Sequence, residues 1–284
     1  MTTLLIARLT FDEALRRKMI WAVLIMSAVF LTLYAFGFQI LRDDLVEFDH
    51  ARGGFPNEVL SYDVQASAMV LLGLYTVNFL AGIMTIFAAV GSISGEIESG
   101  TLHAVIPKPL ARWEIIAGKY LGYFAMIAVY LSLMVTGVIL TSRYIGQYTP
   151  PNILNGLALL ILVSGILLSL TMLGSTIFST MANGVIVFML YGMAVTGGLV
   201  EQIGNALDND TMVRIGVLTS VIVPSDSIWK LASYVVQPSV AVNLIGPNPF
   251  GTSAPPSDLA VRYAIAYCAT LVVASMLVFR RRDI

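Results

Sequence analysis

The chain has 284 residues, of which 57% are hydrophobic and only 12% are charged, and its mean hydropathy is +0.84. Soluble domains carry about 25% charged residues, so this composition excludes a water-soluble globule and indicates lipid as the main solvent. A net charge of −1, one cysteine and two histidines exclude a basic nucleic-acid-binding surface, a disulfide scaffold and a histidine-rich metal site.

Residues 1–18 predict an amphipathic helix that lies in the membrane plane. Apolar residues recur there at helical spacing, and basic residues fall off that stripe. An ordinary solvated lead-in to the first span is the alternative. The stripe comprises Leu4, Ala7, Phe11, Ala14 and Leu15, and the basic residues are Arg8, Arg16 and Arg17.

Six stretches are long and apolar enough to cross a bilayer. A hydrocarbon core of about 30 Å requires roughly 20 helical residues. Five charge-free windows have about that length, and the longest, 144–200, is divided by a polar cluster that includes Ser175 and Asn183. The predicted spans are 19–40, 67–93, 120–141, 153–174, 184–201 and 260–279.

The distribution of Lys and Arg predicts the orientation, because these residues collect in cytoplasmic loops. With the N-terminus inside, ten of the 16 Lys and Arg residues lie on the cytoplasmic side. The other six are spread over longer, acidic outer loops. We therefore expect a multi-pass protein with both termini in the cytoplasm.

The segment 95–118, between the second and third spans, is predicted to be cytoplasmic. Glu96 and Glu98 end a long apolar helix, Gly100 can terminate that helix, and 101–106 form a short exposed turn. Such a projection fits contact with a cytoplasmic partner. Composition alone would favour a simple positively charged loop.

The segment 202–258, before the last span, is too long for a plain loop and too apolar for disorder. Ser225 can cap a helix, and Trp229 suits the headgroup layer. We expect an interfacial or re-entrant helix on the outer side. Its apolar face would contain Ile228, Leu231, Ala232, Val235 and Val236.

The spans contain almost no ionisable residues, which argues against ion-coupled transport and against an intramembrane enzyme. No catalytic residues are therefore assigned. A translocation path is expected along Tyr75, Thr76 and Asn78, where the lining would suit a lipid-like or hydrophobic cargo. Asn78 equally fits a hydrogen bond between helices.

The stretch GEIESGTLHAVIPKPLARWEIIAGKYLGY, residues 95–123, resembles ABC transporter permeases of the ABC-2 class, in particular their single-domain bacterial type. The chain's ending, Phe279 to Asp283, is also similar to that of the family. The likeness covers the whole chain, so 1–284 is expected to be one transmembrane domain. This chain has Lys108 before Pro109, at a position where family members often carry Ser or Leu. The family pattern is matched by Glu96, Glu98, Ser99, Gly100, Thr101, Leu102, Pro109, Arg112, Gly118 and Lys119.

The resemblance implies an all-α integral membrane protein with six transmembrane helices. It also implies an N-terminal in-plane elbow helix, a cytoplasmic coupling helix within 98–106 and a structured outer segment. The protein would be the permease half of an exporter in the cytoplasmic (inner) membrane. It would pair with a second permease half, as a homodimer, and with separate ABC ATPase subunits that bind ATP and Mg.

The resemblance also assigns residues to these parts. Glu96 and Glu98 would pair with basic residues of the elbow helix or of the ATPase. ATPase coupling would involve Glu96, Glu98, Gly100, Thr101, Leu102, His103 and Arg112, and the elbow helix would use Arg8, Phe11, Arg16 and Arg17.

The chain lacks the G-x-x-x-x-G-K-[ST] phosphate loop, so a separate subunit must hydrolyse ATP if that motif is required. We expect the chain itself to bind no cofactor and no metal, and its partners to be the lipid bilayer and proteins. A non-transporting membrane anchor or assembly factor, driven by an associated ATPase, is the alternative function.

Overall fold

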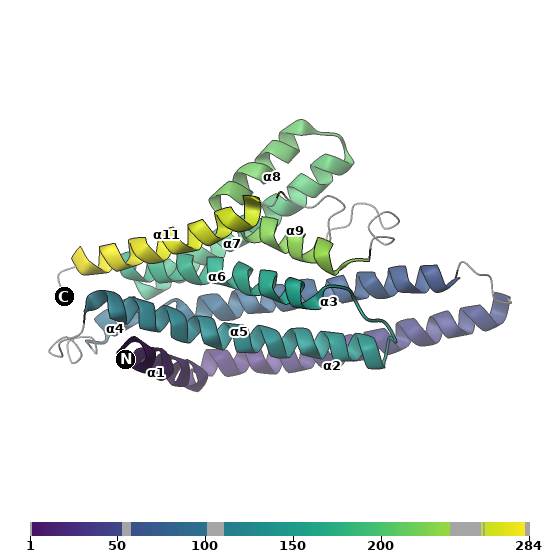
Figure 1. Ribbon diagram of the computed structural model, residues 1–284, viewed down its shortest axis with the longest axis horizontal. Coiled ribbons are helices and arrows are strands. Elements are labelled where there is room, and N and C mark those ends of the chain that lie inside the picture. Colours follow the sequence, from purple (N-terminus) through teal and green to yellow (C-terminus); the bar gives the residue numbers. More distant parts are fainter. Residues whose placement is uncertain (1, 53–57, 101–110, 239–256, 258, 282–284) are drawn as a thin grey trace.

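The computed structural model describes residues 2–52, 58–100, 111–238, 257 and 259–281 (Figure 1). Every regular element within these residues is an α-helix. The helices are α1 (Thr2–Arg16), α2 (Lys18–Arg52), α3 (Glu58–Ala89), α4 (Ser94–Glu98), α5 (Arg112–Tyr144), α6 (Ile153–Ile177), α7 (Thr180–Ala206), α8 (Asp210–Ile222), α9 (Ser225–Val236) and α11 (Leu259–Arg281).

Among the described residues, six helical segments are long and apolar enough to cross a membrane, and each overlaps one of the expected spans. The bent pair α8 and α9 adds a seventh if it counts as one span. The expected all-α integral membrane fold is therefore confirmed. The six segments are Lys18–Asp43, Tyr62–Glu98, Arg112–Tyr144, Ile153–Ile177, Thr180–Ala206 and Leu259–Arg281.

Helices α3 and α6 form the centre of the bundle. In their most apolar windows, 67% of the residues of the second segment and 61% of those of α6 are buried, against 22% for α2 and 17% for α11. A helix that is apolar on all sides suits such a central position. The outer helices keep large apolar side chains exposed, such as Trp21, Ile25 and Leu33 of α2, which suits contact with lipid tails.

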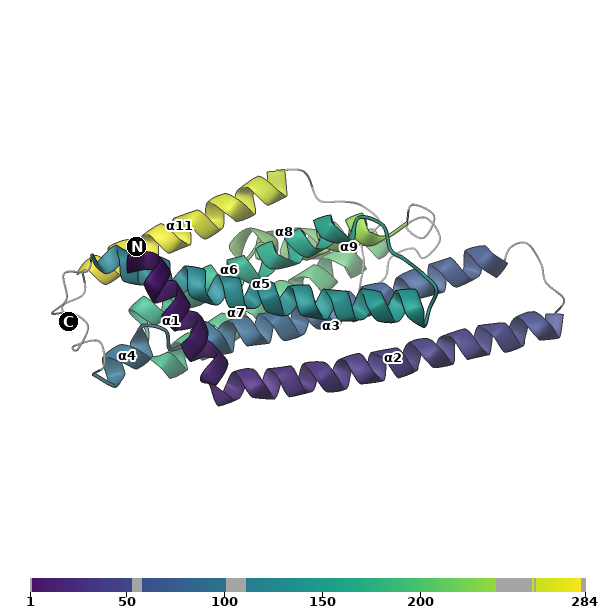
Figure 2. The same ribbon diagram turned by 60° about the horizontal axis from the view of Figure 1, so that its bottom comes forward.

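Helix α1 turns away from α2 at Arg17 and crosses the beginning of α5 (Figure 2). Gly118 and Gly122 of α5 allow this close approach. A Cβ atom at Gly118 would lie 2.7 Å from the Cβ of Ile6, and one at Gly122 would lie 2.8 Å from the Cβ of Thr10. These glycines therefore bring the two backbones together.

The sequence indicated one continuous helix that ends near Glu98. The structure shows instead that the helix of the second span is interrupted. Helix α3 ends at Ala89, the helical conformation is interrupted over 90–93, and the one-turn helix α4 follows. Gly100 then adopts a φ of 71°, the left-handed conformation that commonly ends a helix.

The outer segment contains two helices, α8 and α9, bent by 104° relative to each other. Asn209 caps α8 through its side-chain oxygen, which accepts hydrogen bonds from the backbone N–H groups of Thr211 and Met212. Helices α7 and α8 form a hairpin that projects from the bundle, whereas α9 returns to pack on α6 (Figure 1). Residues 239–256 of the expected outer segment lie outside the described residues.

The predicted orientation of α9 is only partly correct. Ile228, Ala232 and Val236 are buried as expected, but Trp229 is only 3% exposed and does not lie on the surface that a headgroup would contact. Its ring packs edge-on against Tyr75, with ring centroids 5.5 Å apart. Helix α9 is therefore a packed element of the bundle.

Candidate functional site

The break between α3 and α4 is held by side chains from neighbouring helices. The Ser175 hydroxyl of α6 accepts hydrogen bonds from the backbone N–H groups of Ile93 (2.9 Å) and Ser94 (3.1 Å). Asn183 of α7 donates from Nδ2 to the carbonyl of Val90 at 2.8 Å. Backbone groups that the broken helix frees are thus satisfied by side chains, as burial requires.

Lys119 of α5 adds a charge to this break. Its ammonium donates to the carbonyl of Ser92 at 2.6 Å and forms an ion pair with Glu96 of α4 at 2.5 Å. Lys119 is only 6% exposed. Within the described residues, Glu96 therefore pairs with a buried residue of the third span, and not with a basic residue of the elbow helix, which was one of the two expected partners.

Arg17, between α1 and α2, reaches the same region. Its guanidinium donates to the carbonyl of Ala88 at 3.3 Å and to Glu13 at 2.8 Å. Burial lowers the pKa of Arg17, but the neighbouring Tyr123 and Glu13 outweigh burial and raise the pKa above its ordinary value. Arg17 therefore stays charged and ties the start of α2 to the end of α3.

Glu98 ties α4 to the first turn of α7. Its carboxylate accepts hydrogen bonds from the backbone N–H of Thr180 at 3.1 Å and from the Thr180 hydroxyl at 3.2 Å. The Ser94 and Thr180 hydroxyls lie 2.8 Å apart. A carboxylate is favourable at a helix N-terminus, so Glu98 serves as a cap supplied by another helix.

We call this arrangement the α3–α4 junction, because side chains from several other elements converge on it. It comprises the break 90–93, helix α4, and the side chains of Arg17, Lys119, Ser175, Thr180 and Asn183.

The other expected coupling residues are only partly described. Thr101, Leu102 and His103 lie outside the described residues. Arg112, at the start of α5, donates to the carbonyls of Phe279 (3.5 Å) and Arg280 (3.2 Å) at the end of α11. Arg112 thus joins the beginning of the third span to the end of the last.

The expected elbow residues do not form one face. Arg8 and Arg16 are exposed, whereas Phe11 and Arg17 are half-buried. The helix predicted at 1–18 is present as α1, and its apolar stripe lies partly against the bundle and partly on the surface. Ala14 is buried, but Leu4 is 72% and Leu15 40% exposed, because α1 turns Thr10 and Ala14 toward the bundle.

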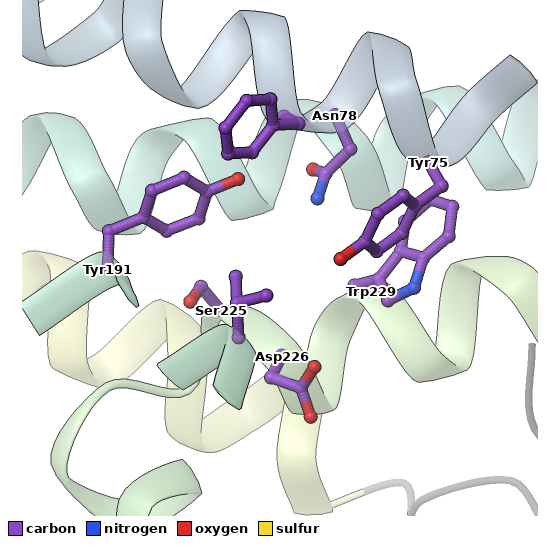
Figure 3. A pocket seen from close by; sticks show the side chains of 8 residues that line it. Tyr75, Asn78, Tyr191, Ser225, Asp226 and Trp229 are labelled. Atoms are coloured by element: carbon purple, nitrogen blue, oxygen red, sulfur yellow. The ribbon is translucent and has the colours of Figure 1, made fainter. Parts of the chain in front are cut away.

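The expected path residues separate into two groups. Tyr75 and Asn78 line a cavity between α3, α7 and α9, together with Tyr191, Ser225 and Trp229 (Figure 3). Thr76 is not among the described residues that line this cavity, and its hydroxyl donates to the carbonyl of Leu72 in its own helix.

Sequence reasoning missed Ser175, Asn183 and Lys119 as members of the junction. Ser175 and Asn183 were used only to divide a long apolar window, and Lys119 was noted only as part of a motif. The available signal was polar side chains within apolar stretches, which in membranes usually find partners on other helices.

The helices and their polar junction define a multi-pass, all-α membrane protein. The sequence matches the profile of the ABC-2 family transporter proteins over residues 4–284, which is almost the whole chain. The chain therefore belongs to the ABC-2 transporter family, whose permeases are the membrane components of ABC transporters and work with ABC ATPase subunits. A search among curated proteins found no match.

Proposed function

We propose that this chain is the permease half of an ATP-driven exporter in the cytoplasmic membrane. Two identical chains pair, and separate ABC ATPase subunits bind ATP and Mg and supply the energy. Membership of the ABC-2 transporter family supports the permease role. The α3–α4 junction is the observation that carries the proposed coupling mechanism.

The junction offers a route for mechanical coupling. Helix α4 leads directly into the segment proposed to touch the ATPase, and it is tied to α5 through Glu96 and to α7 through Glu98. Helices α3 and α7 also line the cavity that contains Tyr75 and Asn78. A displacement of α4 would therefore act on the helices that surround the proposed path, as coupling through a two-state element requires.

The arrangement of the helix ends supports the proposed orientation. Helix α1, helix α4 and the end of α11 lie at the same end of the bundle (Figures 1 and 2). Arg112 contacts the last turn of α11, which carries Arg280 and Arg281. Basic residues favour the cytoplasmic side, so we place this end, and both termini, in the cytoplasm.

Co-purification tests the ATPase partner. The tagged full chain is extracted from its native membrane in a mild detergent, and accompanying proteins are identified by mass spectrometry. We expect a stoichiometric ATPase of the P-loop type, lost in the double variant Thr101→Asp with Leu102→Asp. The matched control, Leu207→Asp in the exposed turn between α7 and α8, should retain it. Purification without an ATPase, under conditions that preserve other complexes, would contradict the proposal.

Transport itself is tested with the complex in sealed vesicles. ATP-dependent movement of a compound out of the compartment that holds the termini would support an exporter. A complex that hydrolyses ATP yet moves none of the lipid-like and hydrophobic compounds tested would contradict the transport role. That result would favour the membrane anchor or assembly factor instead.

A further inference from the structure

The beginning of α5 and the end of α11 lie side by side at one end of the bundle (Figures 1 and 2). Arg112 joins the two helix ends, because its Nη1 atom donates to the carbonyls of Phe279 and Arg280. A groove of about 560 Å³ opens between them. Sites for organic ligands commonly have volumes of about 300–1,000 Å³, so this groove has room for part of such a molecule.

The groove is basic at its mouth and apolar along its wall. Arg112 and Arg280 line it at the two helix ends, and Arg280 is exposed. Val273 and Leu277 of α11 form the apolar wall and are 53% and 52% exposed. Val273 precedes Arg280 by seven residues, so it lies about 10 Å from the charged end of the helix. A ligand that fills the groove must therefore combine a charged group with an apolar portion.

The mouth of the groove favours a negatively charged group. Two guanidinium groups line it, and none of the described lining residues is a carboxylate. Glu114 does not line the groove, and its carboxylate accepts a hydrogen bond from the backbone N–H of Ala111 at 3.3 Å. Guanidinium groups match phosphate in both charge and geometry.

The depth of the groove in the bilayer is indicated by Trp113. This residue lines the groove and is 54% exposed, and tryptophan is enriched at the level of the lipid headgroups. Arg112 precedes it directly, and Arg280 lies in the last turn of the final span. The two arginines therefore lie where the phosphates of a bilayer lie, and the apolar wall lies where acyl chains begin.

Two other kinds of occupant fit the groove less well. A water-soluble partner would meet the arginines but not the apolar wall, because Val273 and Leu277 lie within the last membrane-spanning segment. A second copy of the chain that presented the same face would bring arginines against arginines. A lipid with an anionic headgroup matches both parts of the groove, and basic pockets between transmembrane helices bind such lipids.

We propose that the groove between the beginning of α5 and the end of α11 binds an anionic phospholipid. The phosphate lies between Arg112 and Arg280, and an acyl chain lies along Val273 and Leu277. The lipid thus bridges the first turn of the third span and the last turn of the sixth. Binding requires neither an ATPase nor transport, so it does not depend on the proposed function. Only its assignment to the cytoplasmic leaflet rests on the proposed orientation.

Fluorescence quenching by brominated lipids tests the site, because bromine on an acyl chain quenches only a tryptophan that it contacts. The chain has three tryptophans, Trp21, Trp113 and Trp229. Trp21→Phe with Trp229→Phe leaves Trp113 as the reporter of the groove. Trp113→Phe with Trp229→Phe leaves Trp21, which is 59% exposed on α2, as the matched reporter. Each full-length variant is placed in phosphatidylcholine nanodiscs that contain a small fraction of brominated lipid.

We expect brominated phosphatidylglycerol to quench Trp113 at a severalfold lower fraction than brominated phosphatidylcholine does. Trp21 lies three residues after the exposed Lys18, so it reports the general enrichment of anionic lipid near a basic residue. The preference for phosphatidylglycerol at Trp113 should exceed the preference at Trp21 severalfold, because two arginines and an apolar wall act together in the groove.

Substitutions of Arg280 connect the preference to the groove. Arg280→Gln removes one charge but keeps the backbone carbonyl that Arg112 contacts, so the preference at Trp113 should fall about fivefold. Arg280→Lys keeps the charge and should retain most of the preference. Lys18→Gln removes an exposed charge at the start of α2 and is the matched control, which should retain the full preference.

Three results would overturn the proposal. Equal quenching of Trp113 by the two brominated lipids would mean that the groove does not select an anionic headgroup. Quenching of Trp113 by neither lipid would mean that protein, such as a second copy of the chain, covers the groove. An unchanged preference in Arg280→Gln would mean that the preference arises elsewhere on the protein.

Discussion

At the residue scale, a few polar side chains within apolar helices determine the α3–α4 junction. Lys119 contacts both the backbone of the break and the carboxylate of α4. Glu98 contacts the backbone of another helix, where it replaces a missing cap. Lys119 is buried and Glu98 is exposed, so the two residues are expected to affect different properties.

Lys119→Met is expected to destabilise the protein. The substitution keeps an apolar side chain of similar length but leaves Glu96 and the carbonyl of Ser92 without their cation. The side chain of Glu96 is 28% exposed and can still be solvated, so the cost is expected to be about 1–3 kcal/mol, the range for a buried polar group that loses its partner. The unfolding temperature in detergent should fall clearly, whereas Lys18→Met, at an exposed position, should leave it unchanged. Wild-type stability of Lys119→Met would show that the ion pair contributes nothing.

Glu98→Ala is expected to impair coupling more than folding. It removes hydrogen bonds from an exposed carboxylate, each worth about 1 kcal/mol, so the unfolding temperature should change little. ATP-dependent transport by the complex should fall about tenfold while ATP hydrolysis continues, because α4 is no longer tied to α7. Asp12→Ala, which removes an exposed carboxylate from α1, is the control. Wild-type transport by Glu98→Ala would contradict this role.

At the scale of elements, glycines decide how closely helices approach. Gly122 permits contact between α5 and α1, and Gly198 permits contact between α7 and α9. Gly192 has a different environment, since a Cβ atom built there would have no described neighbour within 4 Å apart from the adjacent residues and the backbone of its own helix. Glycine lowers the stability of a helix relative to alanine. Its presence at a close helix crossing therefore indicates that the packing it permits compensates for this loss of stability.

Gly122→Ala is expected to displace α1. The new methyl group would overlap the backbone of Ala7 and the side chain of Thr10, so α1 would have to move. A cysteine at position 10, in a background with Cys268→Ser, is buried in the native packing and should react slowly with a maleimide. Gly122→Ala should accelerate this labelling severalfold, while Gly192→Ala should not. Unchanged labelling would mean that α1 tolerates the larger residue.

At the scale of the whole molecule, helix lengths exceed what a bilayer needs. With 35 residues α2 extends about 52 Å, against a hydrocarbon core of about 30 Å. Helix α2 therefore continues beyond the membrane. The α7–α8 hairpin projects from the side of the bundle, away from the end that carries α1 and α4 (Figure 1). The hairpin and the end that carries α1 and α4 therefore offer two separate positions at which the proposed orientation can be tested.

The proposed orientation predicts asymmetric accessibility. Tags at both termini should be digested by protease only in inside-out vesicles. A cysteine at position 208, in the exposed turn between α7 and α8, should react with a membrane-impermeant maleimide only in right-side-out vesicles. A terminal tag accessible from the outside would reverse the assignment and would place the junction on the wrong side for a cytoplasmic ATPase.

The class of fold and the family could both be predicted from the amino-acid sequence. Long charge-free windows require helices that satisfy their own backbone groups in lipid, so hydropathy predicted six spans without reference to tertiary contacts. The stretch from Glu96 to Lys119 was sufficient for the likeness to ABC-2 permeases, which the family match confirmed. Hydropathy and a motif of this kind depend only on residues that are close together in the sequence.

The pairing of polar residues, in contrast, depends on how the helices pack against one another. The break at 90–93 depends on Ser175, Asn183 and Lys119, which are distant in sequence and lie on three different helices. The burial of Trp229 and Lys230 depends on the return of α9 to the bundle. Periodicity shows which face of a helix is apolar, but a buried polar group is stable only where another element supplies its partner, and that is set by the packing of the whole chain.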